Sequence, residues 1–149
     1  YPYAALGELL AEEPHAVLRE VDRVMIMREM HNLWRTNLMR GELFAVRDLL
    51  KDDGLLGIEQ HRAKADAPYS YADGNKGYLR EADVIKFMEV NGFELVAKSE
   101  INANPKDSAN WPDGVWTLPP ALRLKDVDKA KYEAIGESDR MTLLFKKRP

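Results

Sequence analysis

Residues 21–62 contain two apolar segments separated by a helical pattern, and this combination restricts the chain to few folds. The first segment, residues 21–28, has branched apolar residues and methionine over the length of one buried strand. The second, residues 55–58, follows Asp52, Asp53 and Gly54, which are typical of a helix end and a turn. The helix between them is predicted by apolar residues at helical spacing: Met39, Leu43, Val46 and Leu50, widened by Phe44 and Leu49. Two strands joined in this way form a right-handed βαβ unit, in which they run parallel.

Polar residues follow both predicted strands. Ligands of open α/β sheets bind beyond the carboxyl ends of the strands. Here those ends carry Arg-Glu-Met-His-Asn at 28–32 and Glu-Gln-His-Arg at 59–62. Five side chains are therefore expected on one rim of the sheet: His31, Asn32, Glu59, His61 and Arg62. Neighbouring strands lie about 4.8 Å apart, so with allowance for loops we expect the two histidines within roughly 15 Å of each other.

Charge and composition limit the partners. The 149 residues carry a net charge of −3, which predicts no nucleic-acid-binding surface. The chain has no cysteine, which excludes disulfides, thiolate metal sites and cysteine nucleophiles. No apolar run approaches the roughly 20 residues that span a bilayer, so we expect a soluble protein, cytoplasmic or periplasmic. The sequence begins at Tyr1 and shows no basic segment followed by an apolar one, so it does not indicate a cellular compartment.

The remaining chain is expected to complete a single partial domain. Residues 1–20 are predicted to be mainly helical, and residues 21–101 to form the α/β core. Within that core, residues 63–77 have the composition of a surface loop, 81–90 the pattern of a helix, and 93–101 the alternation of a strand. A long insertion is expected at 102–138, with a short helix at 126–134. The last segment, 139–149, is expected to contain a final strand at 141–147.

Three segments resemble the second half of class I S-adenosylmethionine-dependent methyltransferases, and two more resemble a subgroup. MREMHNLWR (27–35) is similar to the loop after the family's fourth strand. LLKDDGLLGIEQHRA (49–63) resembles the turn into the fifth strand, with two aspartates in place of the usual Pro-Gly. GYLREADVIKFMEVNGFELVAKSEI (77–101) resembles the helix and strand that follow. INANPKDSANWPDGVWTLPPALRL, together with IGESDRMTLLFKKR, is similar to one subgroup of predicted bacterial methyltransferases.

The resemblance implies both a fold and a function. The fold would be α/β, the carboxyl-terminal half of a Rossmann-like methyltransferase fold. Its mostly parallel strands would be ordered fourth, fifth, seventh, sixth, with an antiparallel last strand between its neighbours. The function would be methyl transfer from S-adenosylmethionine to an unknown small molecule by in-line displacement. The alternative is a non-catalytic α/β binding module or remnant that pairs with a partner.

The family's cofactor-binding half has no counterpart in the sequence. In the family, a glycine-rich G-x-G turn after the first strand holds the methionine part of the cofactor. No G-x-G occurs in the 149 residues. Because glycine allows a close backbone approach that other residues hinder, we expect this chain alone to bind S-adenosylmethionine more weakly than micromolar, or not at all.

The strand ends and the resemblance together predict the site residues. The catalytic group is His31, His61 and Glu59, in which a histidine accepts a proton and Glu59 pairs with His61 on the same face of the strand. The predicted cofactor contacts are Arg28, Glu29 and Met30, and the predicted substrate contacts are Asn32, Trp34, Arg62, Tyr78 and Trp111. The simpler alternatives are a histidine that caps the next helix, polar residues at a strand exit, and tryptophans that anchor the insertion. The three histidines lack metal-ligand spacing, so no metal is expected.

The strand at 21–28 also predicts an interaction edge. Val24 and Ile26 would lie on one face and Met25 and Met27 on the other, as in a strand buried on both sides. Without the first half of the domain, one edge of this strand would lack a partner. Such an edge pairs with a second copy or another chain, or aggregates, unless residues 1–20 cover it.

Overall fold

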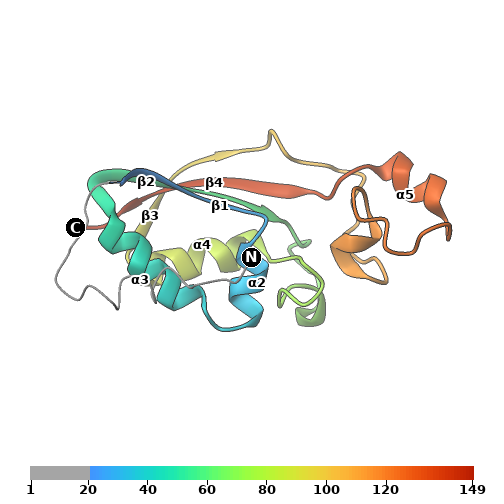
Figure 1. The fold of residues 1–149 in the computed structure, drawn as a ribbon, viewed down its shortest axis with the longest axis horizontal. Coiled ribbons are helices and arrows are strands. Elements are labelled where there is room, and N and C mark those ends of the chain that lie inside the picture. Colours follow the sequence, from blue (N-terminus) through green and yellow to red (C-terminus); the bar gives the residue numbers. More distant parts are fainter. Residues whose placement is uncertain (1–20) are drawn as a thin grey trace.

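The computed structural model describes residues 21–149, and the helical prediction for residues 1–20 lies outside them. The sheet contains β1 (Val21–Met27), β2 (Leu50–His61), β3 (Phe93–Ser99) and β4 (Arg140–Lys147), in the order β1-β2-β4-β3 (Figure 1). β1 is parallel to β2, whereas β4 is antiparallel to both β2 and β3. Three strands therefore share one direction, and the last strand in sequence lies reversed between two of them. The predicted α/β class, strand order and antiparallel last strand are confirmed.

The predicted turn at residues 52–54 is wrong. α3 (Met39–Leu49) passes directly into β2, because Leu50 already has extended backbone angles. Val21 pairs with Leu50, but Arg23 pairs with Leu55, so the two aspartates and Gly54 bulge out of the pairing inside the strand. A Cβ on Gly54 would lie 2.8 Å from the side chain of Leu50, which explains why a glycine stands in this bulge.

Three helices cover one face of the sheet: α2 (Met30–Arg35), α3 and α4 (Glu81–Val90) (Figure 1). The predicted helix at 81–90 has the observed boundaries, whereas α2 forms where only a loop was expected. The apolar stripe of α3 is narrower than predicted, since Phe44 is 57% exposed. The core between the helices and the sheet is formed by Met30, Met39, Leu43, Val46, Leu50, Leu56, Ile58, Leu79, Val84, Met88, Phe93, Met141, Leu143 and Phe145.

No described helix covers the opposite face of the sheet (Figure 1). Val24 and Ile26 pack against the core, but Met25 is 66% and Met27 49% exposed. Within residues 21–149, the prediction that β1 is buried on both sides is therefore wrong. A mostly apolar hollow of about 350 Å³ lies on this face, with Met25, Met27, Gly57 and Leu144 in its lining. Among the described strands, β1 pairs only with β2, which leaves its other edge open.

The insertion lies beyond the carboxyl ends of β1 and β2 (Figure 1). It contains the short 3-10 turn η2 (Gly114–Thr117) and α5 (Lys129–Ile135), which begins three residues later than the helix expected at 126–134. A second 3-10 turn, η1 (Tyr69–Tyr71), lies in the predicted surface loop. A small second core, formed by Ala63, Ala72, Tyr78, Ala109 and Val115, fixes these loops to the end of the sheet. Within residues 21–149 no helix is long and apolar enough to cross a membrane.

Candidate active site

A cavity of about 280 Å³ lies at the carboxyl ends of the parallel strands. One side is polar and combines the start of α2, the end of β2 and the segment before β4: Arg28, His31, Asn32, His61, Glu137, Ser138 and Arg140. The other side is apolar and comes from the insertion, chiefly Trp116, Leu118, Pro119 and Pro120. The insertion therefore forms a wall of this cavity.

A reversal of the chain after β1 places His31. Arg28 has a left-handed φ of 52°, and its backbone N–H donates to the Glu59 carbonyl at 2.7 Å. This reversal starts α2 against the end of β2, and Met30 and His31 become the buried residues of that helix. The Nδ1 atom of His31 lies 3.2 Å from Oε1 of Gln60, and the ring meets Trp116 edge-on at 5.9 Å.

His61 is the last residue of β2 and lines the same cavity. Its Nδ1 lies 2.6 Å from the hydroxyl oxygen of Ser138, and its ring centroid is 5.5 Å from that of His31. Burial lowers the pKa of His61 to about 3, helped by the nearby His31 and Arg140. Burial also lowers the pKa of His31, although its bond to Gln60 opposes the shift. Both imidazoles are therefore neutral at pH 7.

The structure brings together three of the five residues expected on the rim. His31, Asn32 and His61 share the cavity, and the distance between the two histidines is well inside the expected limit. Glu59 does not join them. Its carboxylate pairs with the guanidinium of Arg140, and it lines the hollow on the uncovered face. The predicted pair between Glu59 and His61 is wrong, because each of them has another partner.

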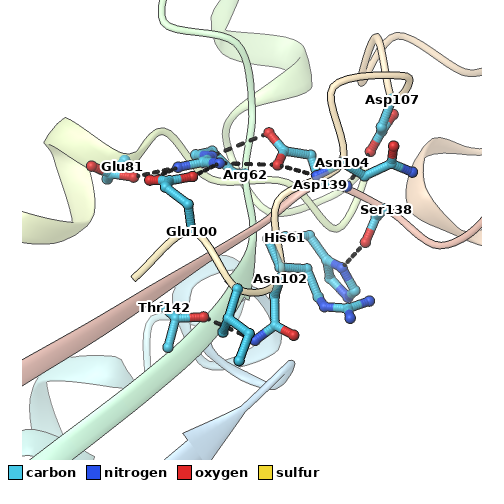
Figure 2. A network of polar contacts seen from close by, with 12 residues as sticks. His61, Arg62, Glu81, Glu100, Asn102, Asn104, Asp107, Ser138, Asp139 and Thr142 are labelled. Carbon is cyan, nitrogen blue, oxygen red and sulfur yellow. Dashed lines mark hydrogen bonds and ion pairs between the residues drawn. The ribbon is translucent and has the colours of Figure 1, made fainter. Parts of the chain in front are cut away.

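Arg62, the fifth residue, points into a separate cluster of carboxylates (Figure 2). Its guanidinium donates to Asp139 at 3.0 and 3.1 Å, to Glu81 at 2.9 Å and to Glu100 at 2.6 and 3.0 Å. The bonds to Glu100 and Asp139 raise the pKa of Arg62 above its usual value. These contacts join β2, α4, the exit of β3 and the start of β4. Because they use the donors of Arg62, and Arg62 does not line the cavity, the predicted substrate contact finds no support.

Of the other predicted substrate residues, Asn32 lines the cavity, whereas Tyr78, Trp111 and Trp34 do not. The Tyr78 hydroxyl donates to the buried carboxylate of Asp107 at 3.1 Å, and Nε1 of Trp111 donates to the same group at 2.7 Å. Burial, together with the charge of Asp107, raises the pKa of Tyr78. Trp34 packs against Phe87 with ring centroids 4.9 Å apart. In these positions the three aromatic residues anchor loops and helices.

Most of the predicted contacts to S-adenosylmethionine are engaged in other interactions. Of the three predicted cofactor contacts, only Arg28 lines the cavity. The side chain of Met30 is fully buried in the core, and the Glu29 carboxylate accepts a bond from the Asn32 amide at 3.1 Å. The sequence also lacks a G-x-G turn. Within residues 21–149 no group of three histidine or acidic side chains could hold a metal ion.

Sequence reasoning gave no role to Gln60, Ser138 and Arg140, which hold or surround the two histidines. It considered Trp116 as part of a pocket wall but favoured a role in anchoring the insertion, whereas this ring lines the cavity. Gln60 offered a signal, since it is a polar residue at the end of a predicted strand. Ser138 and Arg140 offered none, because their partners lie far away along the chain.

No family model matches the sequence, and no curated protein matches it. Among solved structures, the [4+2]-cyclase SpnF is similar with a TM-score of 0.56 at 11% identity, over 87% of this chain and 50% of SpnF. The pyocyanin biosynthetic protein PhzM has a TM-score of 0.49 at 14% identity, over 95% of this chain and 38% of PhzM. This chain therefore spans half the length of SpnF and less than half the length of PhzM. The likeness to SpnF and the strand order identify the fold as the carboxyl-terminal half of a Rossmann-like methyltransferase fold.

Proposed function

We propose that this chain is the substrate-side half of an S-adenosylmethionine-dependent methyltransferase that acts on a small molecule. The observation that carries the proposal is the cavity at the carboxyl ends of the strands, where two neutral histidines face an apolar wall. This is where open α/β sheets bind their ligands. The volume of about 280 Å³ is near the lower end of the range for small-molecule pockets, roughly 300–1,000 Å³.

The residues of this chain would orient the methyl acceptor and take up its proton. The cofactor would supply the methyl group, and residues outside this chain would hold most of it. His31 is the proposed proton acceptor, because a neutral imidazole can accept a proton without first losing one. His61 is the weaker base of the two and is held by Ser138, so its proposed part is to position the acceptor.

The test compares two forms of the protein. Calorimetric titration of the 149-residue chain with S-adenosylmethionine should show no micromolar binding. The product of the complete coding region should bind the cofactor and transfer a labelled methyl group to an acceptor from a small-molecule library. In that protein His31→Asn should lower kcat by about 10²- to 10⁴-fold, the usual contribution of a general base, with cofactor affinity unchanged.

The matched control for His31→Asn is Lys98→Ala, an exposed residue outside the cavity, which should transfer methyl groups like the parent. Failure of the complete product to bind the cofactor would overturn the proposed function. Full activity of His31→Asn would instead remove only the role of His31.

A second candidate function rests on the uncovered face of the sheet. Met25 and Met27 are exposed beside an apolar hollow, and β1 has an open edge among the described strands. A non-catalytic module would use this surface to pair with a second copy or another chain. Light scattering and backbone amide exchange on the purified chain test it. Strong protection of the β1 amides in a monomeric sample would contradict pairing through this edge.

A further inference from the structure

The orientation of one buried amide determines the chemistry of the cavity. The side chain of Gln60 is fully buried, and its Nε2 donates to two backbone carbonyls, that of His61 at 3.1 Å and that of Gly77 at 2.7 Å. Carbonyl oxygens only accept hydrogen bonds, so this end of the amide must be the NH₂ group. The other end, Oε1, must therefore be the oxygen, and it points at His31.

This oxygen determines which nitrogen of His31 carries the proton. Oε1 of Gln60 lies 3.2 Å from the backbone nitrogen of His31 and 3.2 Å from its ring Nδ1. Because Oε1 can only accept, Nδ1 must be the protonated nitrogen. A neutral imidazole has a single N–H, which leaves the lone pair on Nε2. Within residues 21–149, no protein group bonds to this Nε2, and His31 lines the cavity.

The charges around the cavity compensate one another. Arg28 lies 3.9 Å from Glu137, and Arg140 pairs with both Glu137 and Glu59. Glu59 lies outside the cavity lining but neutralises Arg140 from the other face of the sheet, so two guanidinium groups and two carboxylates balance, and both histidines are neutral. An ionic ligand would lose its hydration here without gaining an unpaired counter-charge. The apolar wall at Trp116 and Pro119 instead suits a flat apolar body, and about 280 Å³ suits one or two rings.

We propose that the cavity binds an uncharged, flat, mostly apolar molecule with one O–H or N–H group, and that His31 Nε2 accepts its hydrogen bond because Gln60 fixes the ring tautomer. This inference rests on the proposed function and names the class of acceptor. Gln60 acts through His31 and is a positioning residue. The oxygen or nitrogen of this group would receive the methyl group, and its proton would go to His31.

The tautomer is tested by nitrogen NMR of the imidazole rings in the full 149-residue chain at pH 7. We expect His31 to show a protonated Nδ1 and an unprotonated Nε2. In Gln60→Leu both nitrogens should move toward averaged shifts, while Lys98→Ala should keep the parent pattern. A parent spectrum with the proton on Nε2 would overturn the proposal without any variant, so a Gln60→Leu chain that fails to fold would not weaken the test.

The ligand class is tested without cofactor, by NMR titration with three matched probes: 2-naphthol, 2-methoxynaphthalene and 2-naphthoate. We expect 2-naphthol to bind about fivefold more tightly than 2-methoxynaphthalene, the ratio that one net hydrogen bond gives, and 2-naphthoate to bind most weakly. His31→Gln should reduce the preference for 2-naphthol to less than twofold. Equal binding of the two neutral probes, or tightest binding of the anion, would overturn the proposal.

The proposed ligand class and the proposed methyltransferase function can be refuted independently. A chain that prefers 2-naphthol while the complete product transfers no methyl group would keep the ligand class and refute the methyltransferase. Methyl transfer to a carboxylate, with no preference for 2-naphthol, would do the reverse.

Discussion

His61 and Arg62 are neighbours at the end of β2, yet they belong to two different kinds of polar environment. His61 ends β2, and Arg62 continues the extended chain in a bridge with Leu79, so their side chains point to opposite sides: one reaches the cavity and the other the carboxylate cluster. Among the described residues, the His61 ring bonds only to Ser138, and the buried ring lines the cavity. Arg62 has three carboxylate partners (Figure 2).

The comparison separates a residue that holds the fold from one that is free to bind. A buried polar group that is fully bonded lowers the energy of one arrangement and has nothing left to offer a ligand. A neutral ring with one nitrogen that no described residue bonds can still form a hydrogen bond with a ligand. Residue type alone would have predicted Arg62 as the ligand-binding residue, since arginine is the commoner ligand for anionic substrates.

The largest effect should come from the carboxylate cluster. Arg62→Met removes the cation and leaves Asp139 and Glu81 without it, and the free energy of unfolding should fall by about 3 kcal/mol. Urea denaturation with an unchanged slope measures it. The control is Lys98→Ala, which removes a 48% exposed partner of Glu81 and should leave the free energy of unfolding almost unchanged. A loss below about 1 kcal/mol for Arg62→Met would mean that the cluster contributes little to the fold.

The next largest effect is the pH dependence of stability, which differs between the cavity and the carboxylate cluster. His61 has a lowered pKa of about 3 in the folded chain, against about 6.5 when unfolded, so the unfolded state binds more protons between these values. Stability is therefore complete above pH 6.5 and falls as the pH drops, by about 2 kcal/mol at pH 5. Urea denaturation at pH 7 and pH 5 measures this, and His61→Gln should flatten the change.

The carboxylate cluster should respond in a lower window. Arg62 lowers the pKa of Glu100 below its usual value, so its contribution is present above about pH 4.5 and is lost as the pH falls further. A stability profile that is flat from pH 7 to 5 and falls only below 4.5 would contradict the neutral, buried state of His61.

A smaller effect is expected from the hydroxyl that holds His61. Ser138→Ala removes the bond to Nδ1 at 2.6 Å and should cost about 1 kcal/mol. Thermal or urea unfolding measures the loss, and the Arg62 contacts should stay intact. Rigid, unshifted ring signals of His61 in this variant would show that Ser138 does not set the orientation of the ring.

The smallest effect lies at the outer side of the cluster. Glu100 bonds to Arg62 but is 61% exposed, so Glu100→Gln should cost about 0.5 kcal/mol. Urea denaturation at low and high salt checks it. A loss close to that of Arg62→Met would show that the exposed Glu100 contributes most of the stability of the cluster. It would contradict a cluster stabilised mainly by Asp139 and Glu81.

Local patterns predicted most of the fold. Apolar spacing located α3 and α4, and alternation located β3, because these signals arise within a few residues. The resemblance predicted the order of the strands. The turn expected at residues 52–54 failed because two aspartates and a glycine are also tolerated in a bulge, and only the pairing with β1 distinguishes the two.

The site was predictable only in its position. Parallel strands bring their ends together, so His31 and His61 could be expected near each other. The partners of each polar residue depend on contacts across the chain: Arg62 and Asp139 are 77 positions apart, as are His61 and Ser138. No local pattern in one sequence encodes such pairs, which is why Arg62 was predicted as a ligand and Ser138 was missed.

The place of β4 in the sheet has a consequence for the synthesis of the protein. Among the described strands, the last one to be made is central in the sheet, and it supplies the partners of both β2 and β3. At about 5–20 residues per second, the ribosome needs on the order of ten seconds to reach it after β2 is complete. Throughout that interval Leu56 and Ile58, fully buried later, have no strand on that side. The nascent chain therefore exposes apolar strand surface of the kind that chaperones bind, and a stop codon at the start of β4 would remove this strand from the middle of the sheet.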